Sequence, residues 1–279
     1  MGTDKRERQK ANRQLKLEEL ARDARKAKTK KRGLQIGVGV PALIVAVFLL
    51  VRLFGSDTSS TPTSATTTTV ATDVGLPSTT IGTPPATDAS GAYPCPAADG
   101  TAPRVVAFKA AAPSCIAVGK TYTALIETNK GSYTVALDAV NSPLNVNQFV
   151  YLARYHFYDG TPCHRAIKDF MVQCGDPTGT GSGGAGISVP VEAPKSGKYA
   201  LGTVAMAKAS GATTNDSQFF VITGDAGVAL PAEYSLLGQV TDGFDTSVRG
   251  LEAAADPAAS NGVPTKEPIF ITKVTITEQ

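Results

Sequence analysis

The hydrophobic pattern divides the chain into three unlike parts. An uncharged apolar run covers residues 33–51, a Ser- and Thr-rich stretch follows, and beyond Cys95 there are short runs rich in strand-forming residues. Such runs, bounded by turn residues as at Asn129-Lys130-Gly131, predict short β-strands. The segments with this pattern are TYTALIET, YTVALD, ISVPVE, SQFFVIT, SLLGQV and PIFITKVTITEQ.

Two segments in the same part of the chain have helical periodicity. One is predicted to begin at Ser142 and Pro143, because serine can cap a helix and proline suits its first turn. The other follows Asp242. Their apolar faces consist of Val146, Phe149, Val150 and Ala153 in the first helix and of Phe244, Val248, Leu251 and Ala255 in the second. Many short strands with only two helices predict a mainly β domain, an antiparallel barrel or sandwich, in which closure would remove exposed strand edges.

The apolar run predicts a transmembrane helix, which we place at residues 33–54. As a helix, its nineteen uncharged residues would span roughly the 30 Å hydrocarbon core of a bilayer. Thirteen cations precede the run and Arg52 alone follows it closely, which places the amino end in the cytoplasm. A cleaved signal peptide is the alternative, but its charged region would be unusually long and no small-residue cleavage site follows. We therefore expect a single-pass protein of the cell membrane, with its carboxyl-terminal part outside the cytoplasm.

The remaining boundaries follow from composition. Residues 1–32 are predicted to form a basic cytoplasmic segment. Residues 55–92 are predicted to form a linker, because eighteen Ser or Thr and four Pro among residues 56–92 cannot bury enough apolar surface to fold. An irregular lead-in over residues 93–120 precedes the folded domain, residues 121–279.

The distribution of charge excludes one class of function. Residues 1–32 hold thirteen of the 27 Lys and Arg and five of the 24 Asp and Glu, so the rest of the chain carries a net charge of −5. A nucleic-acid-binding domain is expected to carry its basic residues on the folded part. We therefore expect no nucleic-acid partner.

The four cysteines, Cys95, Cys115, Cys163 and Cys174, form an even set on the side of the membrane where disulfides persist. Four thiols allow three pairings. The segments PCHRAI and FMVQCG look like the two strands of one hairpin, which favours a Cys163–Cys174 bridge and leaves Cys95 with Cys115. Free buried thiols are the alternative. A thiol–disulfide activity is not favoured, since the sequence has no Cys-x-x-Cys motif.

The sequence predicts neither a cofactor nor a metal. The Gly-rich stretch 176–186 contains G-x-G-x-x-G, but the segment ISVPVEAP after it does not look helical, so we interpret the stretch as a long surface loop. The spacing of cysteine and histidine matches no zinc site. With only two histidines and no G-x-S-x-G motif, a hydrolytic site is not indicated either.

Four blocks of sequence together resemble one family, the cyclophilin-type peptidyl-prolyl cis-trans isomerases. They are YDGTPCHRAIKDFMVQCGDPTGTGSGG (158–184), GTVAMAK (202–208), NDSQFFVIT (215–223) and LPAEYSLLGQV (230–240). The resemblance runs from about Tyr122 to Ile276 and keeps the family's order and spacing. It implies a closed eight-stranded antiparallel barrel with two helices. It also implies rotamase activity (EC 5.2.1.8) that needs neither metal nor cofactor.

The resemblance implies roles for individual residues as well. Arg165 is similar to the family's catalytic arginine, and Phe170 and Gln173 are grouped with it as catalytic residues. The residues similar to the family's proline pocket and peptide path are Met171, Ala207, Lys208, Gln218, Phe220, Leu230 and Tyr234. His164 is expected to be structural and to point away from the site. The implied protein is a monomeric, membrane-anchored bacterial isomerase that acts on proline-containing unfolded or exported polypeptides.

Several residues depart from the family's pattern. Cys163 and Cys174 stand where phenylalanine and glycine are common, and Ala166 replaces a larger aliphatic residue. Lys208 and Tyr234 stand in place of a frequent asparagine and a frequent histidine. The changes close to the arginine leave a second hypothesis open, namely a non-catalytic chaperone or scaffold that binds proline-containing segments.

Overall fold

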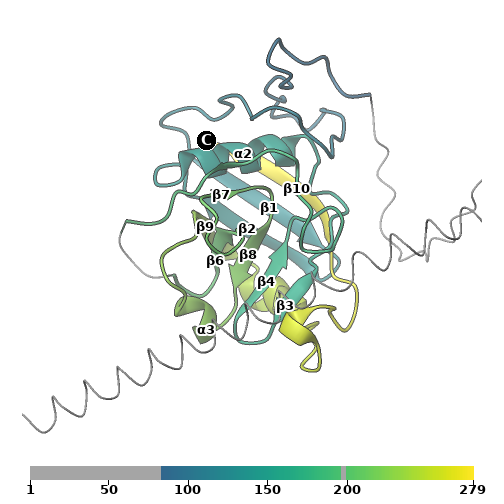
Figure 1. Ribbon diagram of the computed structural model, residues 1–279, viewed down its shortest axis with the longest axis vertical. Coiled ribbons are helices and arrows are strands. Elements are labelled where there is room, and N and C mark those ends of the chain that lie inside the picture. Colours follow the sequence, from purple (N-terminus) through teal and green to yellow (C-terminus); the bar gives the residue numbers. More distant parts are fainter. Residues whose placement is uncertain (1–82, 196–198) are drawn as a thin grey trace, which may run out of the picture. The chain divides into compact units, whose positions relative to one another are not determined.

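Five of the six predicted strand segments lie in one eight-stranded sheet (Figure 1). The computed structural model describes residues 83–195 and 199–279. Along the sheet the strands follow the order β10-β1-β2-β9-β6-β8-β4-β3, and each neighbouring pair is antiparallel. Their bounds are Tyr122–Thr128 (β1), Gly131–Leu137 (β2), Arg165–Ile167 (β3), Met171–Cys174 (β4), Thr203–Met206 (β6), Phe219–Ile222 (β8), Leu236–Asp242 (β9) and Ile271–Glu278 (β10).

One predicted strand is much shorter than its pattern suggested. The segment ISVPVE contributes only β5 (Val189–Pro190), which pairs with β7 (Thr214–Asn215) in a separate two-stranded sheet. Proline cannot donate a ladder hydrogen bond, so Pro190 is confined to such an edge position. The other five segments form β1, β2, β8, β9 and β10, as predicted.

Helix α2 (Pro143–Arg154) confirms the first predicted helix. The predicted serine cap is wrong, however, because the buried Ser142 hydroxyl has no partner among the described residues. Instead, the Glu192 carboxylate accepts hydrogen bonds from the backbone N–H groups of Leu144 (3.2 Å) and Asn145 (2.9 Å). A carboxylate suits this place because the amino end of a helix carries a partial positive charge.

The second predicted helix consists of two short pieces, a π-type turn η1 (Phe244–Val248) and helix α4 (Arg249–Glu252). The structure also contains two short helical elements that the periodicity did not indicate, α3 (Asp225–Val228) and the 3-10 turn η2 (Ser260–Gly262). Elements of three or four residues are too short to show a helical repeat of about 3.6 residues.

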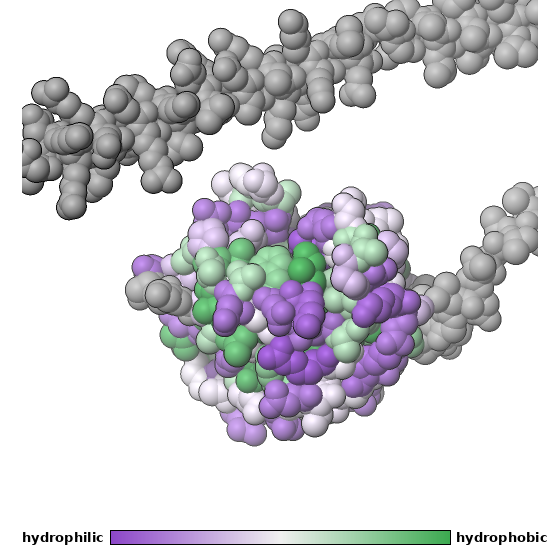
Figure 2. Space-filling view, turned by 90° about the horizontal axis from the view of Figure 1, so that it is seen from below, coloured by the Kyte–Doolittle hydropathy of each residue, from purple (hydrophilic) through white to green (hydrophobic). Residues whose placement is uncertain are grey.

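The strands bury side chains on both faces of the sheet. In β8, Phe219 and Val221 join the main core, whereas Phe220 and Ile222 join a second apolar cluster. This division follows from strand geometry, since successive side chains point to opposite faces. The main core lies against α2, which packs near β10 (Figure 1). On the face shown in Figure 2, hydrophobic residues lie in small groups between hydrophilic ones.

The expectation of a closed barrel is corrected. The curved sheet ends at β3 and β10, and no ladder joins these two strands. The chain just before them is linked by one isolated bridge, Pro162 to Phe270. Three backbone hydrogen bonds hold this link: the N–H groups of Cys163, Ile271 and Gly160 donate to the carbonyls of Ile269 (2.8 Å), Thr161 (2.9 Å) and Ile271 (2.8 Å). The sheet thus approaches closure at this point, but no ladder continues along β3, which has only three residues.

Both favoured disulfides are confirmed. Cys95 is bonded to Cys115, with 5.3 Å between their Cα atoms, and Cys163 is bonded to Cys174. The two cysteines of the hairpin do not face each other, because the strand register pairs Arg165 with Gln173 and sets the cysteines on a diagonal. The Cys163–Cys174 bridge therefore lies directly beside the Arg165–Gln173 pair.

The predicted membrane-spanning segment at residues 33–54, the basic segment at residues 1–32 and most of the predicted linker lie outside the described residues. Within residues 83–195 and 199–279, no helix has the length and apolar character needed to cross a bilayer.

Candidate active site

The hairpin of β3 and β4 places the candidate catalytic residues. Its turn contains Asp169, which has a positive φ of 57°. The buried Glu252 carboxylate of α4 fixes the turn by accepting a hydrogen bond from the Asp169 N–H (2.8 Å). The register that results sets Arg165 opposite Gln173. A turn fixed in this way determines which side chains of the two strands meet on one face.

A cavity of about 160 Å³ lies beside this hairpin. It is lined by Arg165, Phe170, Met171, Gln173, Ala207, Lys208, Phe220, Leu230 and Tyr234. Met171 and Phe220 form its apolar base and are 2% and 5% exposed. The Tyr234 ring packs edge-on against Phe220, with the ring centroids 5.3 Å apart. The base of the cavity is therefore part of the second apolar cluster, and the fold itself holds its shape.

The Arg165 guanidinium borders the apolar cavity and is held from several sides. Its Cζ lies 5.9 Å from the centroid of the Phe170 ring. Its Nη1 donates to the side-chain oxygen of Gln173 (3.1 Å), and its Nε and Nη2 donate to Asn261. Burial lowers the pKa of Arg165, and the nearby Tyr234 acts in the opposite direction. A guanidinium still keeps its charge in proteins.

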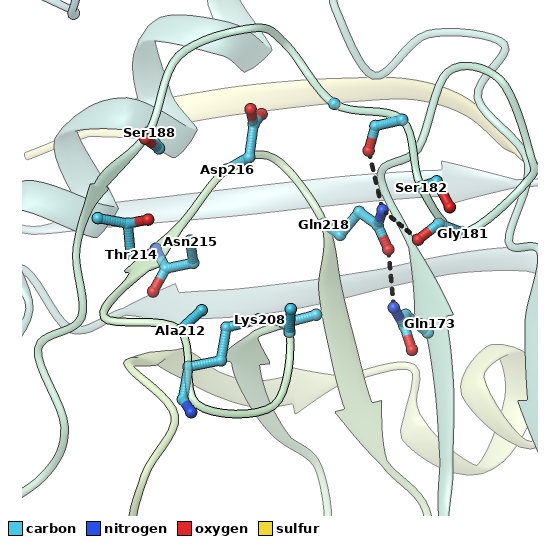
Figure 3. Close-up of a pocket in the computed structure, with 14 residues that line it drawn as sticks. Gln173, Gly181, Ser182, Ser188, Lys208, Ala212, Thr214, Asn215, Asp216 and Gln218 are labelled. Carbon is cyan, nitrogen blue, oxygen red and sulfur yellow. Dashed lines mark hydrogen bonds between the residues drawn. The ribbon is translucent and has the colours of Figure 1, made fainter. Parts of the chain in front are cut away.

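Gln173 and Gln218 connect the arginine to the Gly-rich loop. The Gln173 amide donates to the side-chain oxygen of Gln218 (2.8 Å), and the Gln218 amide donates to the carbonyls of Gly181 (3.1 Å) and Gly183 (2.8 Å). Figure 3 shows Gln218 between Gln173 and this loop. The hydrogen bond between the two glutamines was not predicted. They extend the arginine's hydrogen bonds into a network of side chains and loop backbone.

The Gly-rich loop is organised around one fully buried carboxylate, Asp176. This carboxylate accepts hydrogen bonds from the N–H groups of Thr178 (2.8 Å), Gly181 (2.6 Å) and Gly183 (3.0 Å). Burial raises the pKa of Asp176, but the hydrogen bonds outweigh this effect and leave the pKa below its usual value. The stretch is a loop, as predicted. Its ordering by a carboxylate was not predicted.

A second cavity, of about 510 Å³, adjoins the first and is lined by polar side chains, glycine and alanine, without a large apolar side chain. Gln173, Ala207 and Lys208 line both cavities, and Gln218 lines only the second. In Figure 3, Asp216 lies on the side of the second cavity opposite Lys208. The Lys208 Nζ lies 3.9 Å from the Glu233 carboxylate and 5.2 Å from the centroid of the Tyr234 ring.

The structure brings nine of the ten predicted site residues around the smaller cavity and places Gln218 at the larger one. His164 is 8% exposed and lines neither cavity. Burial lowers the pKa of this histidine. Asn261 contacts the arginine but was missed by the sequence interpretation. The only local signal was the Asn261-Gly262 pair, which indicates a turn and not a function.

Within the described residues, no group of three or more His, Cys, Asp or Glu side chains is arranged to hold a metal ion. The chemistry available at the smaller cavity is that of the Arg165 guanidinium, one side-chain amide (Gln173), two further polar side chains (Lys208 and Tyr234) and an apolar base. Such a cleft can hold a small apolar ring and donate hydrogen bonds to a carbonyl beside it.

A curved antiparallel sheet with two adjoining cavities, the smaller of which has an apolar base, defines a mainly β protein with a cleft suited to a peptide. The family described as "Cyclophilin type peptidyl-prolyl cis-trans isomerase/CLD" matches residues 123–276. The chain belongs to this cyclophilin-type family. The mainly β fold with few helices agrees with that assignment.

Curated relatives support the same family. A "Probable peptidyl-prolyl cis-trans isomerase B" of Mycobacterium tuberculosis is 37% identical over 163 residues, which are 53% of this chain and 52% of the relative. The chain thus spans about half the length of these mycobacterial relatives. A peptidyl-prolyl cis-trans isomerase of Helicobacter pylori is 39% identical over 132 residues, 47% of this chain and 80% of the relative.

Solved structures agree in fold. A cyclophilin-type isomerase of Cryptosporidium parvum has a TM-score of 0.51 at 32% identity, and the match covers 56% of this chain and 98% of that one. Its crystal structure in the presence of the dipeptide Ala-Pro has a TM-score of 0.50 at 34% identity.

Proposed function

We propose that the chain is a peptidyl-prolyl cis-trans isomerase that accelerates rotation about X-Pro bonds. The observation that carries the proposal is the single cavity in which Arg165 lies beside Phe170, Met171 and Phe220. The named isomerases among the relatives support it, and so does the relative crystallised in the presence of Ala-Pro.

The physical basis is the resonance of the tertiary amide. Rotation crosses a barrier of about 18–20 kcal/mol, because the twisted bond loses its partial double-bond character. The apolar base of the cavity holds the proline ring while the preceding carbonyl turns. A guanidinium that donates to the proline carbonyl and approaches the proline nitrogen favours a pyramidal nitrogen, which weakens the conjugation. This interaction is stronger in the twisted state than in either planar state, and so it lowers the barrier.

The test is a proline-switch peptide assay on the full chain, comparing the wild type with Arg165→Ala. Removal of one electrostatic donor from an active site costs about a hundredfold or more in rate, and we expect a loss of this size. Arg165→Lys serves as the matched control. It keeps the charge but not the fork of donors, and we expect it to recover only part of the rate. Equal rates for the wild type and Arg165→Ala would overturn the proposal. Peptide binding without any exchange enhancement would favour the non-catalytic binder.

We further propose that residues 33–54 anchor the chain in a cell membrane and that the domain acts as a monomer outside the cytoplasm on exported proline-containing polypeptides. The two disulfides support this location, because disulfides persist in oxidising compartments. The test is protease treatment of intact cells. We expect loss of the domain with protection of the amino end, and a protected domain would contradict the proposed orientation. Sedimentation of the purified chain tests the monomer.

A further inference from the structure

Asn261, in the turn η2 near the C-terminal end, contacts Arg165 through two different oxygens. The Arg165 Nε donates to the Asn261 backbone carbonyl (2.9 Å), and the Arg165 Nη2 donates to the Asn261 side-chain oxygen (2.7 Å). Residue 261 thus forms two of the three hydrogen bonds that the arginine makes among the described residues. It lies 96 positions further along the chain.

The local backbone explains how one residue presents both oxygens. Asn261 has φ 58° and ψ 27°, the left-handed region that asparagine tolerates better than most residues. Gly262 follows with φ 74°, and a Cβ there would lie 2.5 Å from the backbone oxygen of Ala166 in β3. The Asn-Gly pair therefore lets the turn approach the backbone of β3 closely, where its oxygens reach the guanidinium.

The third hydrogen bond of the Arg165 guanidinium, to Gln173, leaves two of its N–H groups unengaged within the described residues. A guanidinium has five N–H donors. Gln173 accepts one from Nη1, so Nε and one N–H on each terminal nitrogen are engaged within the described part of the chain. One N–H on Nη1 and one on Nη2 then remain for a ligand. Because Gln173 holds one terminal nitrogen and Asn261 the other, rotation of the guanidinium about its Nε–Cζ bond must break both contacts.

We propose that Asn261 is a positioning residue of this site, which aligns the Arg165 guanidinium through the side-chain oxygen. Its part in catalysis rests on the proposed isomerase function. It does not contact the cavity that receives the proline, since it is absent from that lining. It acts through the arginine, by keeping the two unengaged N–H groups in one orientation before the substrate arrives.

The backbone conformation decides which variants test this role. Asn261→Gly keeps the left-handed backbone and the carbonyl that binds Nε, and it removes only the side-chain oxygen. Asn261→Asp also tolerates this backbone and retains an oxygen acceptor for Nη2, so it is the matched rescue variant. Because residue 261 is exposed, both variants are expected to fold, which thermal unfolding verifies.

The experiment measures two quantities on the full chain, the isomerase kcat and KM, and the rotation about the Arg165 Nε–Cζ bond from the ¹⁵N signals of its terminal nitrogens. For Asn261→Gly we expect kcat to fall about fivefold, equivalent to about 1 kcal/mol, with KM within about twofold of the wild type and faster guanidinium rotation. For Asn261→Asp we expect slow rotation and most of kcat to return.

The outcomes test the positioning role of Asn261 separately from the proposed isomerase activity. Unchanged guanidinium rotation in Asn261→Gly overturns the positioning role, whatever happens to kcat. A change in KM with an unchanged kcat also overturns it, because this would indicate a binding contact. If the wild type has no isomerase activity, the proposed function fails, yet the rotation measurement still decides whether Asn261 holds the arginine.

Discussion

The two cavities that meet at Ala207 and Lys208 are built in different ways. The smaller one has an apolar base of strand residues, in which Met171 and Phe220 belong to the second apolar cluster. The larger one is bordered by the Gly-rich loop, whose shape depends on hydrogen bonds to the carboxylates of Asp176 and Asp216. The smaller cavity is thus formed in part by core side chains, whereas the larger one is bordered by a loop whose shape depends on hydrogen bonds to ionised carboxylates.

The two cavities should therefore respond differently to substitution and to pH. Apolar burial depends on volume and shape, so damage to the smaller cavity should reduce folding stability and ring binding together. Carboxylate-centred hydrogen bonds depend on ionisation, so the larger cavity should respond to pH while the smaller one does not. Substitutions in the smaller and in the larger cavity test this difference.

The largest effect is expected for Phe220→Ala. Replacing a buried phenylalanine by alanine costs about 3–5 kcal/mol of unfolding free energy. We expect a loss of this size in denaturant unfolding followed by tyrosine fluorescence, together with isomerase rates close to background, because the base of the proline cavity is removed.

Gln218→Ala is the matched change in the larger cavity. Gln218 is half-buried, and water can replace its hydrogen bonds, so the unfolding free energy should fall by only about 0.5–1.5 kcal/mol. If Gln218→Ala destabilised the protein as much as Phe220→Ala does, the proposed division between a core-built and a loop-built cavity would be wrong.

Two carboxylates that accept hydrogen bonds from the Gly-rich loop, Asp176 and Asp216, should give pH effects of opposite sign. The hydrogen bonds of Asp176 lower its pKa below 3.8. Its stabilisation is therefore present above pH 3.8 and is lost as the pH falls through the lower folded value. Burial raises the pKa of Asp216 above 3.8, and the hydrogen bond from the Ala185 N–H opposes this only in part. As the pH falls, Asp216 is therefore protonated in the folded state before it is protonated in the unfolded state. Acidification through the raised pKa then increases the free energy of unfolding.

The measurement is the unfolding free energy between pH 6 and pH 3 for the wild type, Asp176→Asn and Asp216→Asn. Acidification should destabilise Asp176→Asn less than the wild type, since the carboxylate that loses its contribution is gone. It should destabilise Asp216→Asn more than the wild type, since a compensating proton uptake is gone. Parallel curves for all three proteins would show that neither carboxylate titrates differently in the folded and unfolded states.

The same contrast explains what the sequence could predict. Five of the six strand-like segments were located correctly in the main sheet. Phe219 and Phe220 are successive residues of one of them, so one faces the main core and the other faces the cavity. The resemblance placed nine residues that the structure gathers at one cavity. Both kinds of information describe side-chain patterns within continuous segments.

The features that escaped prediction depend on contacts between distant segments. Glu192 replaces the local serine as the cap of α2 from 47 positions away. Asn261 reaches Arg165 across 96 positions, and Gln218 reaches Gln173 across 45. The link between the two ends of the sheet joins Pro162 to Phe270, 108 positions apart. No local pattern encodes these pairings, because hydrogen-bond partners of this kind are chosen by the tertiary fold.

The smallest effect is expected at the border between the two cavities. Lys208→Met keeps the apolar stem of the side chain and removes the charge that lies 3.9 Å from the Glu233 carboxylate. The Lys208 side chain is 8% exposed and that of Glu233 is 62% exposed, so solvent screens the pair from one side and it contributes about 0–1 kcal/mol. The cation over the Tyr234 ring adds a contribution of about 0.5–1 kcal/mol. Both contributions hold the Lys208 side chain in place and neither is made to the twisted X-Pro bond, so we expect kcat/KM to change by no more than about threefold, with the difference shrinking in 1 M salt, where the screening length is about 3 Å. A double-mutant cycle with Glu233→Gln measures the pair directly. A coupling well above 1 kcal/mol would mean that Lys208 and Glu233 act as a buried pair and that the border, like the smaller cavity, belongs to the core.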